Sequence, residues 1–128
     1  MSIFDWKKFK KVANHLLNYS NEEEYHRSSI GRFYYSSFGP LKEYYEKTFK
    51  RILPSKNSHQ ILINELENSP FIEEQELGKD LRKLRKLRNY ADYNPKKIHE
   101  NVVFDSKEDA EKIFKNLEYL KNNPLRKS

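Results

Sequence analysis

One arginine of this sequence stands where a helix would be expected to bury a leucine. It is Arg88, within the stretch LRKLRNYADY. On an ideal helix it shares one face with four apolar residues spaced three or four positions apart, which are Leu77, Leu81, Leu84 and Ala91. A guanidinium group keeps its charge, so a buried one needs a carboxylate, a carbonyl or a phosphate as its partner. The surroundings of Arg88 are therefore the first candidate for a functional site.

The spacing around Arg88 allows two interpretations. Asp92 follows one helical turn later, which predicts a structural ion pair that closes the end of a helical bundle. Alternatively, Arg88 faces a cleft and meets an anion there. Arg85 and Asn89 flank it on the side of Asp92, and the spacing alone does not choose between the two interpretations.

Charge is distributed unevenly along the 128 residues, whose formal net charge is +6. Residues 65–76 contain five glutamates and no basic residue, whereas residues 79–88 contain six basic residues and one aspartate. Acidic residues at the start of a helix and basic residues at its end are stabilised by the helix dipole, so the pattern fits a solvated helix surface. The alternative is a face that binds a polyanion.

No cofactor or metal ion is expected. The chain has no cysteine, and it contains neither a glycine-rich phosphate loop nor a Ser-His-Asp or zincin motif. Glu23 and His26 form half of a helical di-metal carboxylate site, but no second pair completes it. No spacing selects His26, His59 or His99, and each is expected to be a surface or capping histidine.

Apolar residues recur at helical spacing along most of the chain. The pattern and its caps predict long helices over about residues 3–19, 22–53 and 71–93. They also predict a short third helix that is capped by Asn57 or Ser58 and closed by Ser69-Pro70, and a fifth helix that carries Ala110 to Leu120. Gly39-Pro40 is expected to kink the second helix, and Asp105 with Ser106 to open the last one. With few glycines and short connections, the chain is predicted to be all-α, an up-and-down four-helix bundle with one additional helix.

The length is about that of one domain, predicted to span residues 1–121 and to precede a frayed basic tail over 122–128. The longest stretch without a charged residue, Val12 to Asn21, is shorter than the roughly 18 residues that a membrane-spanning helix requires. No signal-peptide pattern follows Met1. A cytoplasmic protein without a membrane partner is therefore expected.

Aromatic residues crowd the second predicted helix. Four tyrosines, at positions 34, 35, 44 and 45, lie on or beside an apolar stripe that is predicted to run from Arg27 to Ile52. They are expected to fill the edge of the core, and the alternative is a base-stacking surface or a dimer contact. A count of the register along the bundle places Arg27 far from Arg88 within one chain.

Two blocks of this sequence resemble the HEPN superfamily, all-α domains of prokaryotic toxin and defence modules that also occur in eukaryotes. The first block is RSSIGRFYYSSF, residues 27–38, which is similar to the family's Arg-Ser-Ala-Ile-Ser-Arg-x-Tyr-Tyr-x-x-Phe helix. The second is LRKLRNYADY, and residues 22–93 contain both. The resemblance implies a helical bundle that forms a homodimer. In the active ribonucleases it implies an Arg-x(4–6)-His motif from each subunit, lining a shared metal-independent cleft that cleaves RNA.

By position, Arg88 matches the motif arginine and Asn89 the polar residue that often follows it. The motif histidine has no counterpart, because residues 93–97 contain none. The ending Asp92-Tyr93 is similar to a variant branch of the superfamily, although tyrosine, with a pKa of about 10, is a poor general base at neutral pH. The catalytic set that the resemblance implies is Arg88, Asn89, Asp92 and Tyr93. The basic residues expected to bind RNA are Arg27, Arg32, Arg82 and Arg85.

Three functions remain open. The first, ranked highest, is an RNA-targeting protein of a toxin–antitoxin or phage-defence module, in its strongest form a metal-independent endoribonuclease with Arg88 at a dimeric cleft. The second is a non-catalytic HEPN module that binds RNA, a nucleotide or a protein partner and uses Arg88 and Asp92 as a structural ion pair. The third follows from the nucleotidyltransferase partners of the toxin family, which modify a motif tyrosine. Here Tyr90 or Tyr93 would be the modified residue.

Overall fold

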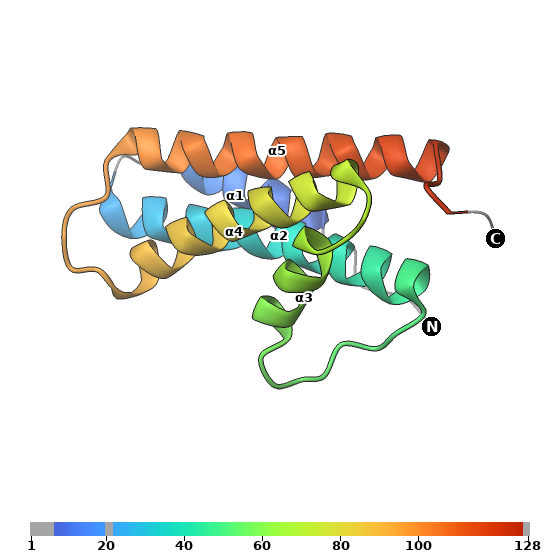
Figure 1. Ribbon diagram of the computed structural model, residues 1–128. Coiled ribbons are helices and arrows are strands. Elements are labelled where there is room, and N and C mark those ends of the chain that lie inside the picture. The colour runs from blue at the N-terminus through green and yellow to red at the C-terminus, as the bar shows by residue number, and fades with distance from the viewer. Residues whose placement is uncertain (1–6, 20–21, 127–128) are drawn as a thin grey trace, which may run out of the picture.

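The computed structural model describes residues 7–19 and 22–126 of the chain. Within these residues the protein forms five helices and no strand, namely α1 (Lys7–Tyr19), α2 (Glu23–Phe49), α3 (Ser58–Glu67), α4 (Ile72–Tyr93) and α5 (Glu100–Asn122) (Figure 1). The prediction of an all-α protein is confirmed. The predicted helix start at Ile3 and the predicted break at Ser20 and Asn21 lie outside the described residues. None of the described helices combines the length and the apolar character needed to cross a membrane.

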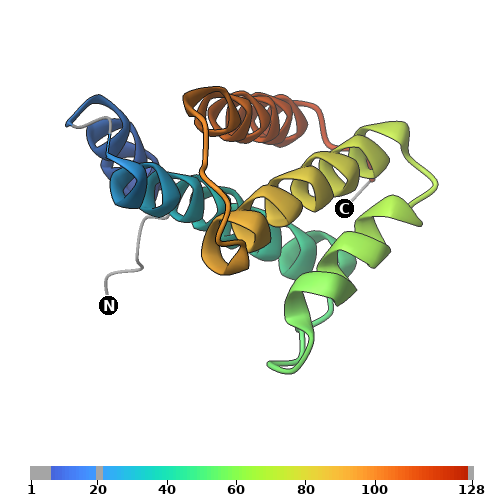
Figure 2. The same ribbon diagram turned by 90° about the vertical axis from the view of Figure 1, so that its left-hand side faces the viewer.

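The long helix α2 is the element that the other four share. It packs against α1, α3, α4 and α5, and Figure 2 shows α1, α4 and α5 disposed around it. Five residues of its predicted stripe are buried, which are Ile30, Tyr34, Phe38, Leu41 and Tyr45. The helix continues past Pro40 but ends at Phe49, where Lys50 adopts a left-handed conformation with φ 56°. Ile52 therefore leaves the helical path and is 87% exposed, so its prediction as a stripe residue is wrong.

Small polar side chains let α2 lie close to its neighbours. Ser29 is fully buried and donates a hydrogen bond of 2.8 Å to the carbonyl oxygen of Ala13 on α1. Ser36 and Ser37 are also buried, and both donate to the carbonyl oxygen of Phe33 within α2. Each of these hydroxyl groups has a partner, so the core accommodates them without the cost of an unpaired donor.

Helices α2 and α4 run antiparallel, so the start of one lies beside the end of the other. Near the start of α2, the Nη1 of Arg27 lies 2.5 Å from the carbonyl oxygen of Ala91, close to the end of α4. Near the opposite ends, the hydroxyl of Tyr44 donates to the carboxylate of Glu74. The apolar residues predicted to face the core from α4 are buried, and they are Leu77, Leu81, Leu84 and Ala91.

Helix α3 approaches α4 closely at a glycine. A Cβ atom at Gly78 would lie 2.8 Å from the Cγ of Glu67 and 2.9 Å from its backbone nitrogen, so a larger residue would force α3 away. Asn57 occupies the N-cap position of α3 with a φ of 60°, a left-handed conformation that asparagine tolerates, but its side chain makes no cap hydrogen bond to the helix. The first turn of α3 is thereby placed against both α2 and α4, where His59 contacts Tyr34 and Gln60 contacts Arg85.

The last helix begins more than one turn earlier than predicted. It starts at Glu100, and Asp105 and Ser106 lie inside it instead of opening it. The hydroxyl of Ser106 donates to the carbonyl oxygen of Val102 at 3.1 Å, as a serine within a helix can. The earlier start puts Val103 into the core, where it is fully buried, so apolar burial outweighs the capping signal at Asp105.

The C-terminal segment is anchored as far as it is described. Leu125 packs against the core, and the guanidinium group of Arg126 donates two hydrogen bonds, of 2.6 and 2.8 Å, to the carboxylate of Glu74. Glu74 is fully buried and also accepts from Ser69 and Tyr44. Burial raises the pKa of Glu74, but these hydrogen bonds outweigh it and hold the pKa below its ordinary value. The prediction of a frayed tail is therefore wrong for Leu125 and Arg126.

Replacing Arg126 by alanine leaves the buried carboxylate of Glu74 without its cation. Because the Arg126 side chain is 31% exposed, we expect the free energy of unfolding to fall by about 1 to 3 kcal/mol, somewhat less than for a fully buried pair. Chemical denaturation measures this loss, and Lys121→Ala is the control because Lys121 is exposed on the last turn of α5. Equal stability of the two variants would show that the tail does not anchor there.

Candidate functional site

Arg88 contacts three groups of its own chain. Its Nε lies 2.9 Å from Oδ2 of Asp92, and its Nη2 donates to the hydroxyl of Tyr35 at 3.1 Å. The guanidinium carbon lies 5.3 Å from the ring centroid of Tyr35 and 5.6 Å from that of Tyr34, within the range of cation–π contacts. The ion pair that the spacing allowed is thus present. At 20% exposure the Arg88 side chain still reaches solvent.

A histidine that the sequence did not single out lies beside the same tyrosines. The Nδ1 of His59 and the hydroxyl of Tyr34 share a hydrogen bond of 2.5 Å. The imidazole ring stacks on Phe38, with the ring centroids 4.0 Å apart, and it meets the ring of Tyr35 at an interplanar angle of 80°. Three residues of α2 thus fix the position of a side chain that belongs to α3.

We call the group formed by Tyr34, Tyr35, His59, Arg85 and Arg88 the arginine–histidine cluster. Within it, burial lowers the pKa of His59, and the positive charges of Arg85 and Arg88 lower it further, to about 4 from an ordinary value of 6.5. Burial also raises the pKa of Tyr34 above its ordinary value, so the phenol keeps its proton. The cluster therefore holds a neutral imidazole next to two guanidinium groups.

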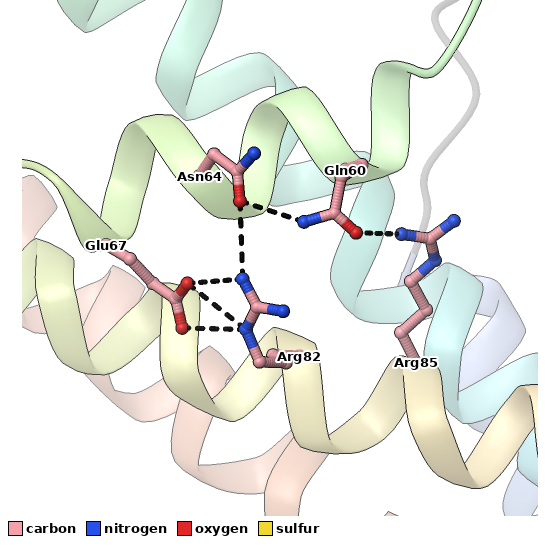
Figure 3. A network of polar contacts seen from close by, with 5 residues as sticks. All are labelled: Gln60, Asn64, Glu67, Arg82 and Arg85. Carbon is pink, nitrogen blue, oxygen red and sulfur yellow. Dashed lines mark hydrogen bonds and ion pairs between the residues drawn. The ribbon is translucent and has the colours of Figure 1, made fainter.

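Arg82 and Arg85 lie one turn apart on α4 but differ in their partners (Figure 3). Arg82 donates hydrogen bonds of 2.6 to 3.1 Å to both carboxylate oxygens of Glu67 on α3. Arg85 donates from Nη1 to the side-chain oxygen of Gln60 at 2.9 Å, which is a neutral group. Its Nε is buried without a partner among the described residues, and no described carboxylate forms an ion pair with it. The described residues thus neutralise Arg82 but provide no carboxylate partner for Arg85.

Arg27 lies at the same end of the molecule as Arg88. Its guanidinium group donates to the carbonyl oxygens of Ala91, at 2.5 Å, and Lys96, at 2.7 Å, and it pairs with Glu23 at 3.0 Å. Ala91 lies only one turn after Arg88, so the register count that separated the two arginines was wrong. The count failed because it did not establish how α2 and α4 align. With these partners, Arg27 fastens the end of α4 and the following loop to α2.

The other predicted residues are more exposed. Asn89 and Tyr93 lie on the last turns of α4, where Tyr93 is 77% exposed. Arg32 is exposed on α2, and its guanidinium carbon lies 5.3 Å from the ring centroid of Phe9. Of the residues predicted from the sequence, Arg85 and Arg88 belong to the arginine–histidine cluster, and Asp92 touches it through Arg88.

The predictions for the histidines succeed only in part. His99 is exposed, as expected of a surface histidine, and it occupies the N-cap position of α5 without a side-chain hydrogen bond to the helix start. His26 is buried instead, and its Nε2 has no hydrogen-bond partner among the described residues. His59 is half-buried in the cluster. No spacing rule could select it, because its contacts with Tyr34 and Phe38 join residues that lie far apart in the sequence, on two different helices.

The chemistry of the cluster suits an anion with several oxygen atoms. Two guanidinium groups and a phenol can donate hydrogen bonds to it, and a neutral imidazole can donate or accept. No group of three His, Asp or Glu residues in the described part of the chain could hold a metal ion. Comparisons with protein-family models, curated proteins and solved structures found no match.

The depressed pKa of His59 predicts a pH dependence of stability. In the unfolded chain His59 binds a proton near its ordinary pKa of 6.5, whereas in the folded protein it does so only near 4. Between these values the unfolded state holds more protons, so the free energy of unfolding falls as the pH falls. We expect the wild-type protein to lose more stability than His59→Gln between pH 7 and pH 4.5 in urea denaturation. Parallel pH profiles would contradict the buried, neutral state of His59.

Proposed function

We propose that this protein is a HEPN-like, RNA-targeting protein of a prokaryotic toxin or defence module, and that Arg88 contacts an RNA phosphate. The observation that carries the proposal is the packing of the two blocks of the family resemblance against each other. Tyr34 and Tyr35 of the first block contact Arg88 of the second, and Arg27 contacts Ala91. In this proposal α1, α2, α4 and α5 are the up-and-down four-helix bundle, and α3 is the additional helix.

A phosphate can compete for Arg88. Its ion pair with Asp92 joins residues one helical turn apart and is partly exposed, and such pairs contribute only about 0.3 to 0.5 kcal/mol. Hydrogen bonds from a guanidinium group to a phosphate are charge-assisted and can form in pairs. Replacing Asp92 by an RNA phosphate as the partner of Arg88 therefore costs little free energy. The hydrogen bond to Tyr35 keeps the side chain of Arg88 in place during this exchange.

The strongest form of the proposal is metal-independent RNA cleavage in a homodimer. The 2′-oxygen would form a bond to the adjacent phosphorus while the bond to the 5′-oxygen breaks, with the proton of the 2′-hydroxyl passing to a base and the leaving oxygen gaining a proton. Arg88 would stabilise the charge that develops on the phosphate, beside Asn89, Asp92 and Tyr93. Because no histidine follows Arg88 at the motif spacing, Arg88 by itself supports RNA binding, and cleavage needs a separate proton acceptor.

A second function is favoured by the contacts that Arg88 makes without any ligand. Asp92 and Tyr35 already satisfy part of its guanidinium group, as expected of a non-catalytic HEPN module with a structural ion pair. Such a module would bind RNA, a nucleotide or a protein partner such as an antitoxin. The exposure of Tyr90 and Tyr93 also fits modification by a nucleotidyltransferase partner.

Arg88→Ala tests the contact with RNA directly. We expect weaker binding of a short single-stranded RNA and a slope of the logarithm of affinity against the logarithm of salt concentration that is smaller by about one, since one phosphate contact is lost. Fluorescence anisotropy measures both. Arg51→Ala is the matched control, because it removes the same charge from an exposed arginine outside the cluster.

Incubating the same variants with mixed RNA in EDTA separates enzyme from binding module. Cleavage by the wild-type protein that is lost in Arg88→Ala would support the ribonuclease, whereas binding without cleavage on any substrate would support the module. If Arg88→Ala bound RNA as well as Arg51→Ala does, Arg88 would not be the RNA contact. A mass of one chain in light scattering would contradict the shared cleft.

A further inference from the structure

Arg85 is a half-buried cation for which the described part of the fold supplies no counter-charge. Five other arginines among the described residues are paired with carboxylates, namely Arg27, Arg51, Arg82, Arg88 and Arg126. Arg85 instead has the neutral side chain of Gln60 as its partner, and its buried Nε has no hydrogen-bond partner among the residues that the structure describes. A partly desolvated charge without a counter-ion is costly, so an arginine in this environment is suited to bind an anion.

The groups around His59 also favour the binding of an anion. From α2 it faces the hydroxyl of Tyr34 and the edge of Tyr35, and from α4 the charges of Arg85 and Arg88 act on it. No carboxylate is among these groups. Burial disfavours the charged form of His59, and the two neighbouring cations disfavour it further, so its pKa lies far below the ordinary range.

We propose that Arg85, Arg88 and His59 form a binding site for a phosphate group, and that His59 takes up one proton when the phosphate binds. The inference rests on the proposed function in taking an RNA phosphodiester as the natural source of that group. It adds Arg85 and His59 to the contact at Arg88 and makes the affinity depend on pH.

The proton uptake follows from electrostatics. An anion held between the two guanidinium groups offsets the charges that disfavour the imidazolium form, and it attracts that form directly. The pKa of His59 must then rise on binding, and by linkage the affinity must increase as the pH falls. Arg85 would gain a counter-charge that the described residues do not provide, and the phenol of Tyr34 would hold the imidazole ring in place while it is protonated.

The wild-type protein allows a test that no folding defect can obscure. NMR follows the pH titration of the His59 ring signal in three samples: the protein without ligand, the protein with sodium sulfate, and the protein with a short RNA that lacks terminal phosphates. Neither ligand titrates near neutral pH. We expect the pKa of His59 to rise by at least about two units with a ligand that binds, while the ring signal of His99, which is exposed outside the cluster, does not respond to the ligand. An unchanged His59 titration with both ligands would overturn the proposal.

Variants test the contribution of each residue to RNA affinity. Lowering the pH from 7 to 5.5 should tighten wild-type binding by about threefold to tenfold, as expected for uptake of one proton. His59→Gln should lose this pH dependence, and Arg85→Gln should bind more weakly at both pH values than Lys86→Gln, an exposed control on the same helix. A pH dependence that persists in His59→Gln would exclude His59 as the group that takes up the proton.

The outcomes separate this inference from the proposed function. If RNA binding depends on Arg88 but RNA leaves the His59 titration unchanged, the proposed function stands and the proton-coupled site is wrong. If sulfate raises the pKa of His59 but RNA does not bind, the anion site stands and RNA is not its ligand.

Discussion

The packing of every other helix against α2 is the constraint on which this structure depends. One helix has to present a buried surface to α1, α3, α4 and α5, and it does so with large apolar residues and with serines that bond back to carbonyl oxygens. Its antiparallel contact with α4 decides which residues meet. The aromatic pair Tyr34 and Tyr35 comes to lie against Arg88, while Tyr44 comes to lie against Glu74.

The two ends of the α2–α4 contact differ in how far their buried charges are neutralised by other groups of the chain. At one end Glu74 is fully buried, but a serine, a tyrosine and Arg126 all donate hydrogen bonds to it, so its charge is satisfied within the chain. At the other end Arg88 is only partly neutralised by an exposed aspartate, and Arg85 has no described carboxylate partner. The first end is built for stability. The second has the unbalanced charge that an anion site requires.

Residue spacing in the sequence was sufficient to predict the features that depend on a single helix. The buried stripe of α2, the apolar face of α4 and the ion pair between Arg88 and Asp92 all follow from 3.6 residues per turn. Spacing failed at helix ends, where Lys50 terminates α2 early and the burial of Val103 extends α5 beyond its apparent cap.

Residue spacing could not predict contacts between segments that are distant in the sequence. The position of His59 depends on the packing of α3 against the aromatic residues of α2. That of Arg27 depends on the alignment of α2 with α4, and that of Arg126 on a buried carboxylate far away in the sequence. The sequence therefore identified Arg88 as the centre of interest and Arg85 as its neighbour. It could not predict that His59 lies beside them.

The central claim is that an anion binds where α2, α3 and α4 meet, and the guanidinium signals of the arginines test it most directly. In an NMR titration with a short single-stranded RNA, the Nε–Hε signals of Arg85 and Arg88 should shift first and most. Those of Arg82 and Arg126, which are paired with carboxylates, should stay in place. Shifts confined to other basic residues, with Arg85 and Arg88 unchanged, would contradict the claim.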